Sequence, residues 1–132
     1  HSFPTRRSSD LLKNHPKVGW LNYAGLPDHA DHALVQKYMG GRASGLISFG
    51  LKATDSLEAG ARFQDALQLF TRLVNIGDAK SLACHPATTT HRQLNAAEMA
   101  KAGVKPDMVR LSIGIEHIDD LIADLDQALA AV

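Results

Sequence analysis

The sequence is poor in cysteine, has no long apolar run, and has no excess of charge of either sign. Cys84 is the only cysteine among 132 residues, which excludes an internal disulfide framework and predicts a reducing, cytoplasmic compartment. Apolar stretches are far shorter than the roughly 20 residues of a membrane span, so no membrane crossing is expected. Because 14 Lys and Arg balance 14 Asp and Glu, neither nucleic acid nor an acidic membrane surface is indicated as a partner.

What is present suffices for one folded domain. The length fits a single domain, and a hydrophobic content of 45% can form one core. With a balanced charge, the composition favours a small neutral or zwitterionic ligand.

The first ten residues differ in character from the rest of the chain. They read HSFPTRRSSD, with two adjacent arginines but without the following apolar segment of about 7–15 residues that a secretory signal requires. The segment resembles adapter or linker sequence translated in frame. We therefore predict a non-native leader over 1–10 and native sequence over 11–132.

Apolar periodicity predicts alternating helices and strands. The helix patterns cover the tail 11–15 and the segments 30–39, 55–70, 96–101 and 118–129. The strand patterns cover 18–23, 46–51 and 109–113, with a strand, loop and strand over 73–83. Since regular crossovers of uniform length are missing, this order predicts an α+β fold, a mainly antiparallel sheet covered by helices.

Polar residues precede several predicted helices as candidate N-caps. Asp28 and Asp55 are suited to cap the helices over 30–39 and 55–70. Asn95 is followed three residues later by Glu98, the spacing of a capping box.

One arginine is a candidate ligand-binding residue. In the strand over 109–113, Val109, Leu111 and Ile113 share one face, which places Arg110 and Ser112 on the other. A guanidinium offers a planar fork of donors that matches a carboxylate. From position alone, a solvated surface arginine is the more common interpretation.

Other combinations of reactive residues are weaker candidates. The pairs His29 with His32, and His85 with His91, lack the partners that a closed zinc site needs, so no metal is predicted. Neighbours on a strand point to opposite faces, so Cys84 and His85 are not expected to form an activated pair, and Cys84 is expected to be a small buried residue. Asp119 and Asp120 fit the first turn of a helix better than an acid–base pair. The glycines show no nucleotide-binding fingerprint.

Three segments together resemble a known family. These are LVNIGDAKSL (73–82), HPATTTHRQL (85–94) and VRLSIGIE (109–116). They are similar to the C-terminal domain of the Cys/Met-metabolism enzymes that use pyridoxal phosphate (PLP), over about 11–132. Together with GLPDH (25–29), these sequence motifs most resemble those of O-acetylhomoserine sulfhydrylases.

The resemblance implies the small C-terminal domain of a fold-type I PLP enzyme, whose preceding domain binds the cofactor. It implies that Arg110 grips the α-carboxylate of an amino-acid substrate, with Asn75 and Thr90 near the same pocket. Many relatives have serine where this chain has Asn75. No catalytic residue is expected in this chain, because the cofactor-binding lysine belongs to the preceding domain; Lys80 does not match its position.

The implied activity is a γ-replacement in transsulfuration and methionine biosynthesis. O-acetyl-L-homoserine and sulfide or a thiol would give homocysteine or methionine, in a homotetrameric parent enzyme, and the isolated chain would be inactive. Two alternatives stay open. One is a relative of cystathionine γ-synthase, cystathionine γ-lyase or methionine γ-lyase; the other is a free-standing amino-acid-binding regulatory α+β domain.

Overall fold

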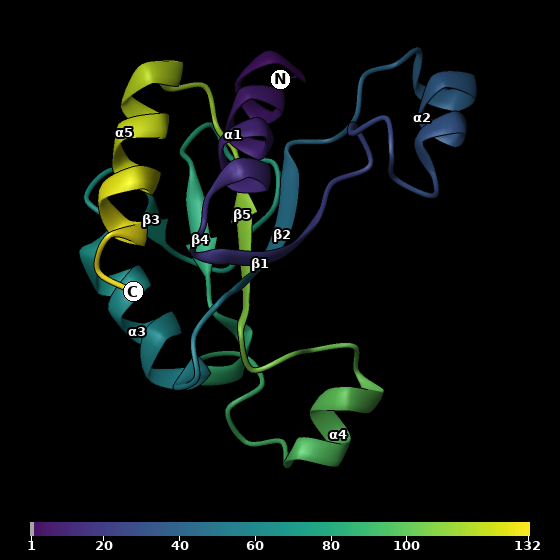
Figure 1. Ribbon diagram of the computed structural model, residues 1–132. Helices are drawn as coiled ribbons and strands as arrows, with labels where there is room; N and C mark the ends of the chain where they lie inside the picture. The colour runs from purple at the N-terminus through teal and green to yellow at the C-terminus, as the bar shows by residue number, and fades with distance from the viewer. Residues whose placement is uncertain (1) are drawn as a thin grey trace.

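The computed structural model describes residues 2–132, and its centre is a five-stranded sheet (Figure 1). In sequence order the strands are β1 (Val18–Asn22), β2 (Leu46–Leu51), β3 (Thr71–Arg72), β4 (Leu82–Cys84) and β5 (Met108–Ser112). In space their order is β1-β2-β5-β4-β3, with β5 in the middle. Only β3 and β4 run parallel, and the other neighbours are antiparallel. The prediction of a mainly antiparallel α+β fold is therefore confirmed.

Three helices pack on one face of the sheet, as Figure 1 shows. They are α1 (Ser2–Asn14), α3 (Ser56–Ala66) and α5 (Ile118–Leu129). Val109 and Leu111 of β5 are fully buried beneath them, as is Phe49 of β2, which packs edge-on against Phe63 of α3 with ring centroids 5.7 Å apart. The predicted bounds of α5 match, and this covered face is the core that the alternation in β5 predicted.

Helix α1 is longer than the sequence predicted. Only its tail from Leu11 was expected, and the structure begins the helix at Ser2. The buried positions of its first two turns are polar, since Thr5, Ser8 and Ser9 are fully buried. The hydroxyls of Ser8 and Ser9 donate to carbonyls of their own helix. Residue 1 of the proposed leader lies outside the described residues, and the origin of 1–10 stays a prediction.

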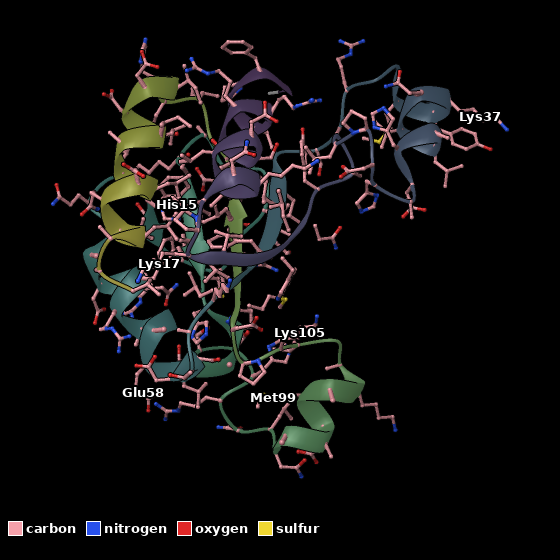
Figure 2. All side chains as sticks on the ribbon, in the orientation of Figure 1. His15, Lys17, Lys37, Glu58, Met99 and Lys105 are labelled. Atoms are coloured by element: carbon pink, nitrogen blue, oxygen red, sulfur yellow. The ribbon has the colours of Figure 1, made fainter. Side chains whose placement is uncertain are left out.

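Two short helices project away from the sheet, α2 (His32–Met39) and α4 (Ala96–Lys101). Figure 2 shows Lys37 on α2 and Met99 on α4, both far from the strands. The predicted capping box of α4 is present. The predicted cap of α2 is wrong: Asp28 instead pairs with Lys13 at 2.7 Å, and the N-cap position is Asp31.

Helix α3 ends earlier than its apolar pattern predicted. It stops at Ala66 rather than continuing to 70. The predicted cap, Asp55, occupies the N-cap position but makes no capping bond and pairs with Arg62 at 2.8 Å. The early end has a physical cause, because Asp124 of α5 accepts the backbone N–H groups of residues 68, 69 and 70.

The segment predicted as strand, loop and strand over 73–83 is shifted. The first strand is β3 at 71–72, and residues 73–81 form a loop, here called the 73–81 loop. The polar loop expected over 86–91 begins with a short 3-10 helix, η1 (Pro86–Thr88). No helix among the residues that the structure describes is long and apolar enough to cross a membrane.

Candidate functional site

The face of the sheet opposite the three helices carries the candidate site. Arg110 lies at the centre of β5, the central strand, opposite Ser48 of β2 and Cys84 of β4. Antiparallel partners point to the same face, so the arginine stands between two small side chains. These neighbours leave room for a long side chain to extend across the face. Sequence reasoning missed Ser48, although the alternation within 46–51 already excluded it from the core face.

Arg110 is half-buried and makes no hydrogen bond or ion pair with any residue from 2 to 132. The other six arginines have different surroundings. Four pair with an aspartate: Arg6, Arg7, Arg62 and Arg72. The remaining two, Arg42 and Arg92, are exposed, where water solvates the charge. Arg110 alone combines partial burial with a guanidinium that no described residue compensates, and such a charge favours an anionic ligand.

The 73–81 loop closes one end of this face. Gly77 donates its backbone N–H to the hydroxyl of Ser112 at 3.1 Å, two residues beyond Arg110 on the same strand. Gly77 has φ +77°, a left-handed conformation that glycine adopts without strain. A cavity of about 330 Å³ lies beside this contact, lined by Leu46 and Ile76 among others. The turn at Gly77 therefore brings the loop that contains Asn75 to the arginine strand.

The loop after η1 closes the face on the side of β4. Thr89 contacts the thiol of Cys84 through its hydroxyl at 3.4 Å. A second cavity, of about 370 Å³, is lined by both residues and by Leu73 and Val74 of the 73–81 loop. Thus the 73–81 loop and the segment after η1 both line a cavity at Cys84, the β4 partner of Arg110.

The two predicted companions of Arg110 lie in these loops but are not joined to it. Asn75 is exposed, and its side-chain oxygen accepts the N–H of Ile76 at 2.9 Å. Thr90 is exposed, and its hydroxyl lies 2.7 Å from Nδ1 of His91. No hydrogen bond connects either side chain to Arg110. Their roles as substrate ligands stay predictions.

His85 is a buried structural residue. Its Nε2 lies 2.7 Å from the carbonyl oxygen of Pro106, so this nitrogen carries the hydrogen and donates it. Its Nδ1 lies 2.9 Å from the hydroxyl of Thr88. Burial lowers the pKa of His85, against the opposing effect of the Pro106 hydrogen bond and of nearby Asp107. The ring is therefore neutral at pH 7 and supports the turn after β4.

The other histidines of the two candidate metal pairs also make local hydrogen bonds. His29 contacts Asn22, and His32 contacts the carbonyl of Ala24. Residues 2–132 contain no group of three His, Cys, Asp or Glu side chains placed to hold a metal ion.

Cys84 is free and buried, as predicted. Its thiol contacts Thr89, whereas the imidazole of His85 contacts Thr88 and Pro106. The two side chains therefore do not form an activated pair. Asp119 and Asp120 lie in the first turn of α5, also as predicted.

A cavity of about 420 Å³ at the β1 edge of the sheet is a weaker candidate. Lys13, Trp20 and Asp28 are among its lining residues. Because Lys13 and Asp28 pair with each other at 2.7 Å, the cavity offers a ligand no uncompensated charge.

The groups around Arg110 match one carboxylate better than a phosphorylated ring cofactor such as PLP. The open face offers one guanidinium with the partly exposed side chain of Ser48 beside it, whereas Cys84 and Ser112 are buried and contact Thr89 and Gly77. A carboxylate matches such a donor set. Lys80 is exposed in the 73–81 loop, and nothing on the open face assigns it a cofactor role.

Comparisons with known proteins identify relatives of this chain. The O-acetyl-L-homoserine sulfhydrylase 1 of Thermus thermophilus is 50% identical over 130 residues, which are 98% of this chain and 30% of the relative. The L-methionine gamma-lyase of Pseudomonas deceptionensis is 44% identical, over 94% of this chain and 30% of the relative. The chain thus spans about a third or less of the length of these relatives.

A solved structure gives the same result for the fold. It is assigned as an O-acetylhomoserine (thiol)-lyase from Campylobacter jejuni and contains a pyridoxyl-lysine monophosphate. It matches with a TM-score of 0.88 and 45% identity, over 98% of this chain and 30% of that one. The profile of the Cys/Met metabolism PLP-dependent enzymes matches residues 5–130. The chain therefore belongs to the Cys/Met metabolism PLP-dependent enzyme family.

Proposed function

We propose that this chain is the substrate-binding part of a PLP-dependent enzyme that replaces the γ-substituent of O-acetyl-L-homoserine with sulfide or a thiol. The observation that carries the proposal is the half-buried guanidinium of Arg110, which has no partner among the described residues and stands on the open face of the sheet. The relatives named as sulfhydrylases support the choice of substrate.

In this proposal Arg110 binds the α-carboxylate of the amino acid in a bidentate manner. Two parallel N–H···O bonds fix the plane of the carboxylate as well as its position. Bound PLP supplies an electron sink for bonds broken at or near Cα, and a fixed carboxylate determines which bond faces the cofactor ring. The contribution of this chain is therefore orientation, and the cofactor is held by protein outside it.

The two loops complete the proposed pocket. The side-chain oxygen of Asn75 is engaged by the N–H of Ile76, so its amide N–H₂ group is the part that can donate to a ligand. Thr90 offers a hydroxyl from the loop after η1, where it lies 2.7 Å from Nδ1 of His91. We propose both as secondary contacts to the substrate, next to the charge of Arg110.

The test is Arg110→Ala in the full-length parent enzyme. Loss of a charge-assisted bidentate contact should weaken substrate binding by about 2–4 kcal/mol, a rise in KM of roughly 30- to 700-fold. Arg110→Lys should restore only part of the affinity, because an ammonium lacks the planar fork. The measurement is steady-state kinetics with O-acetyl-L-homoserine and sulfide.

Arg62→Ala is the matched control. Arg62 is exposed on α3, on the covered side of the sheet, where it pairs with Asp55 and donates to the carbonyl of Ala131 just after α5. Its removal should leave KM within about twofold. An Arg110→Ala enzyme with unchanged KM would refute the clamp. The isolated chain should show no turnover and no absorbance from bound PLP.

A γ-lyase is the second candidate, supported by the relative named L-methionine gamma-lyase. A replacement enzyme forms a thiol or thioether only when sulfide or thiol is supplied, whereas a lyase releases a ketoacid without it. Measuring both products with the full-length parent decides between them.

Three further expectations belong to the same proposal. The free thiol of Cys84 supports a cytoplasmic location. The homotetramer expected of the parent is tested by light scattering of the full-length enzyme. The non-native leader proposed over 1–10 overlaps the family match from residue 5; sequencing the parent gene across the junction tests it.

A further inference from the structure

Ser81, at the end of the 73–81 loop, is fully buried and uses all its polar groups. Its N–H donates to Oε1 of Glu116 at 2.6 Å, and its hydroxyl donates to Oε2 of the same carboxylate at 2.7 Å. The hydroxyl also accepts the N–H of Gly114 at 2.8 Å. Its carbonyl accepts the N–H of Thr71 at 2.9 Å. One residue thus ties together β3, the 73–81 loop and the turn after β5.

The loop and the turn after β5 are in direct backbone contact. Ile115 donates its N–H to the carbonyl of Ala79 at 3.0 Å. A Cβ at Gly114 would lie 2.3 Å from the same carbonyl oxygen and 2.6 Å from Oε2 of Glu116. The turn therefore needs glycine at 114, and the carboxylate of Glu116 occupies a narrow space.

These hydrogen bonds fix the two ends of the 73–81 loop, which contains Asn75. The loop leaves β3 after Arg72 and enters β4 after Ser81, and the N–H of Thr71 donates to the carbonyl of Ser81. Between them, only Gly77 and Ala79 are held to β5 or its turn. Since Glu116 fixes Ser81 with two charge-assisted bonds, it fixes the base from which Asn75 projects.

We propose that Glu116 is a positioning residue for binding of the substrate α-carboxylate. It acts through Ser81, because its bonds to Ser81 determine the position of the 73–81 loop relative to Arg110. Arg110 precedes Glu116 by six residues. This inference rests on the proposed function of Arg110. In this proposal the segments IGIE (113–116) and GDAKS (77–81) together hold the two sides of the carboxylate site at a fixed separation.

The substitution that tests this is Glu116→Gln, which keeps the shape of the side chain. The two donors of Ser81 would then face one oxygen and one N–H₂ group, so one donor loses its acceptor. Ser81→Ala is the second variant: it keeps the backbone bond to Glu116 and removes both hydroxyl contacts. The two variants disturb the same contact from opposite sides.

The readout is the preference of the full-length parent enzyme for a carboxylate. We compare kcat/KM for O-acetyl-L-homoserine with kcat/KM for its α-carboxamide analogue. Both variants should reduce this ratio about tenfold or more, because a misplacement of roughly 1 Å can reduce rates by about 10²-fold. The kcat/KM for the carboxamide, the KM for sulfide and the absorbance of bound PLP should stay as in the unaltered enzyme.

Glu98→Gln is the matched control. The Glu98 carboxylate also accepts a backbone N–H, from Asn95 at 2.9 Å, but on the projecting helix α4. It should leave the ratio unchanged.

Three outcomes separate the two proposals. If Arg110→Ala does not reduce the ratio, the clamp itself is wrong. If Arg110→Ala reduces it and neither Glu116→Gln nor Ser81→Ala does, positioning by Glu116 is wrong and the clamp stands. If the two variants lower kcat/KM equally for both substrates, Glu116 has only a general structural role and the inference is again overturned.

Discussion

Replacing Asp124 by asparagine should destabilise the chain more than the same exchange at any other carboxylate of α5. Asp124 is only 6% exposed. Its Oδ1 accepts the N–H of Gln68 at 2.8 Å, and its Oδ2 accepts those of Leu69 and Phe70 at 2.8 and 2.9 Å. Gln127 donates a fourth bond, at 2.9 Å. A single carboxylate thus satisfies three consecutive N–H groups left free where α3 ends.

The size of the effect follows from the donors that lose an acceptor. Asparagine has one oxygen and one N–H₂ group, so in either orientation the N–H₂ group faces one or two backbone N–H donors. A buried donor without an acceptor costs about 1–3 kcal/mol, and the remaining bonds lose their charge. Asp124→Asn should therefore cost about 2–4 kcal/mol, a large part of the roughly 5–15 kcal/mol of a typical domain.

The same hydrogen bonds make the free energy of unfolding depend on pH. Burial by itself raises the pKa of Asp124, but the hydrogen bonds from Gln68, Phe70 and Leu69 outweigh it, so its pKa lies below the usual value. The unfolded state then takes up the proton first. The stabilisation is complete above the unfolded pKa of about 4 and is lost as pH falls through the lowered pKa. Asp124→Asn should remove this part of the acid dependence.

Urea unfolding, followed by the fluorescence of Trp20, measures both effects on this chain. Asp120→Asn is the control. Asp120 is exposed in the first turn of α5, where its favourable interaction with the helix dipole contributes less than about 1 kcal/mol. If Asp124→Asn and Asp120→Asn have the same free energy of unfolding at pH 7, the carboxylate does not hold the end of α3 as argued.

Two more predictions concern the packing of α3 against the turn after β4. Burial lowers the pKa of His85, so the unfolded state binds the proton first as the pH falls. The contribution of neutral His85 to the free energy of unfolding should therefore be fully present above about pH 6.5 and decrease at more acidic pH. Urea unfolding at pH 5.5 and 7.5 should show this difference, and His85→Gln should reduce it. Gly60→Ala should lower the melting temperature by the equivalent of about 1–3 kcal/mol, since its Cβ would lie 2.3 Å from Nε2 of His85; a higher melting temperature, as helix propensity alone predicts, would contradict the contact.

The sequence predicted best those elements that are determined by local patterns. The capping box of Asn95 and Glu98 involves residues three apart, and it forms as expected. Helix α5 has a complete apolar stripe, and its predicted bounds are those observed. Alternation in β5 correctly placed Val109 and Leu111 in the core and Arg110 on the other face.

Predictions failed where distant residues compete with the local pattern. The apolar periodicity of α3 continues to Phe70, but Asp124, 54 residues later, removes the N–H of Phe70 from the helix. Asp28 has the right spacing for a cap, yet Lys13 of α1 takes its carboxylate. Such partners become visible only when the chain is folded, because nothing in the local spacing marks them.

The candidate site was predictable in its chemistry but not in its construction. Arg110 and the three segments around it could be identified from the sequence. The hydrogen bonds that assemble them, from the N–H of Gly77 to Ser112 and from the N–H of Ser81 to Glu116, join residues 35 positions apart.

The 73–81 loop exposes three apolar side chains beside the strand that carries Arg110. Leu73, Val74 and Ile76 are 50–61% exposed, although the loop that contains them is fixed at both stems. Holding three apolar side chains in water is unfavourable, since each would gain free energy by burial. We therefore expect a partner to cover these side chains in the proposed parent enzyme. The proposed parent supplies one: the cofactor-binding part must approach the carboxylate held by Arg110, and this loop lies beside that approach.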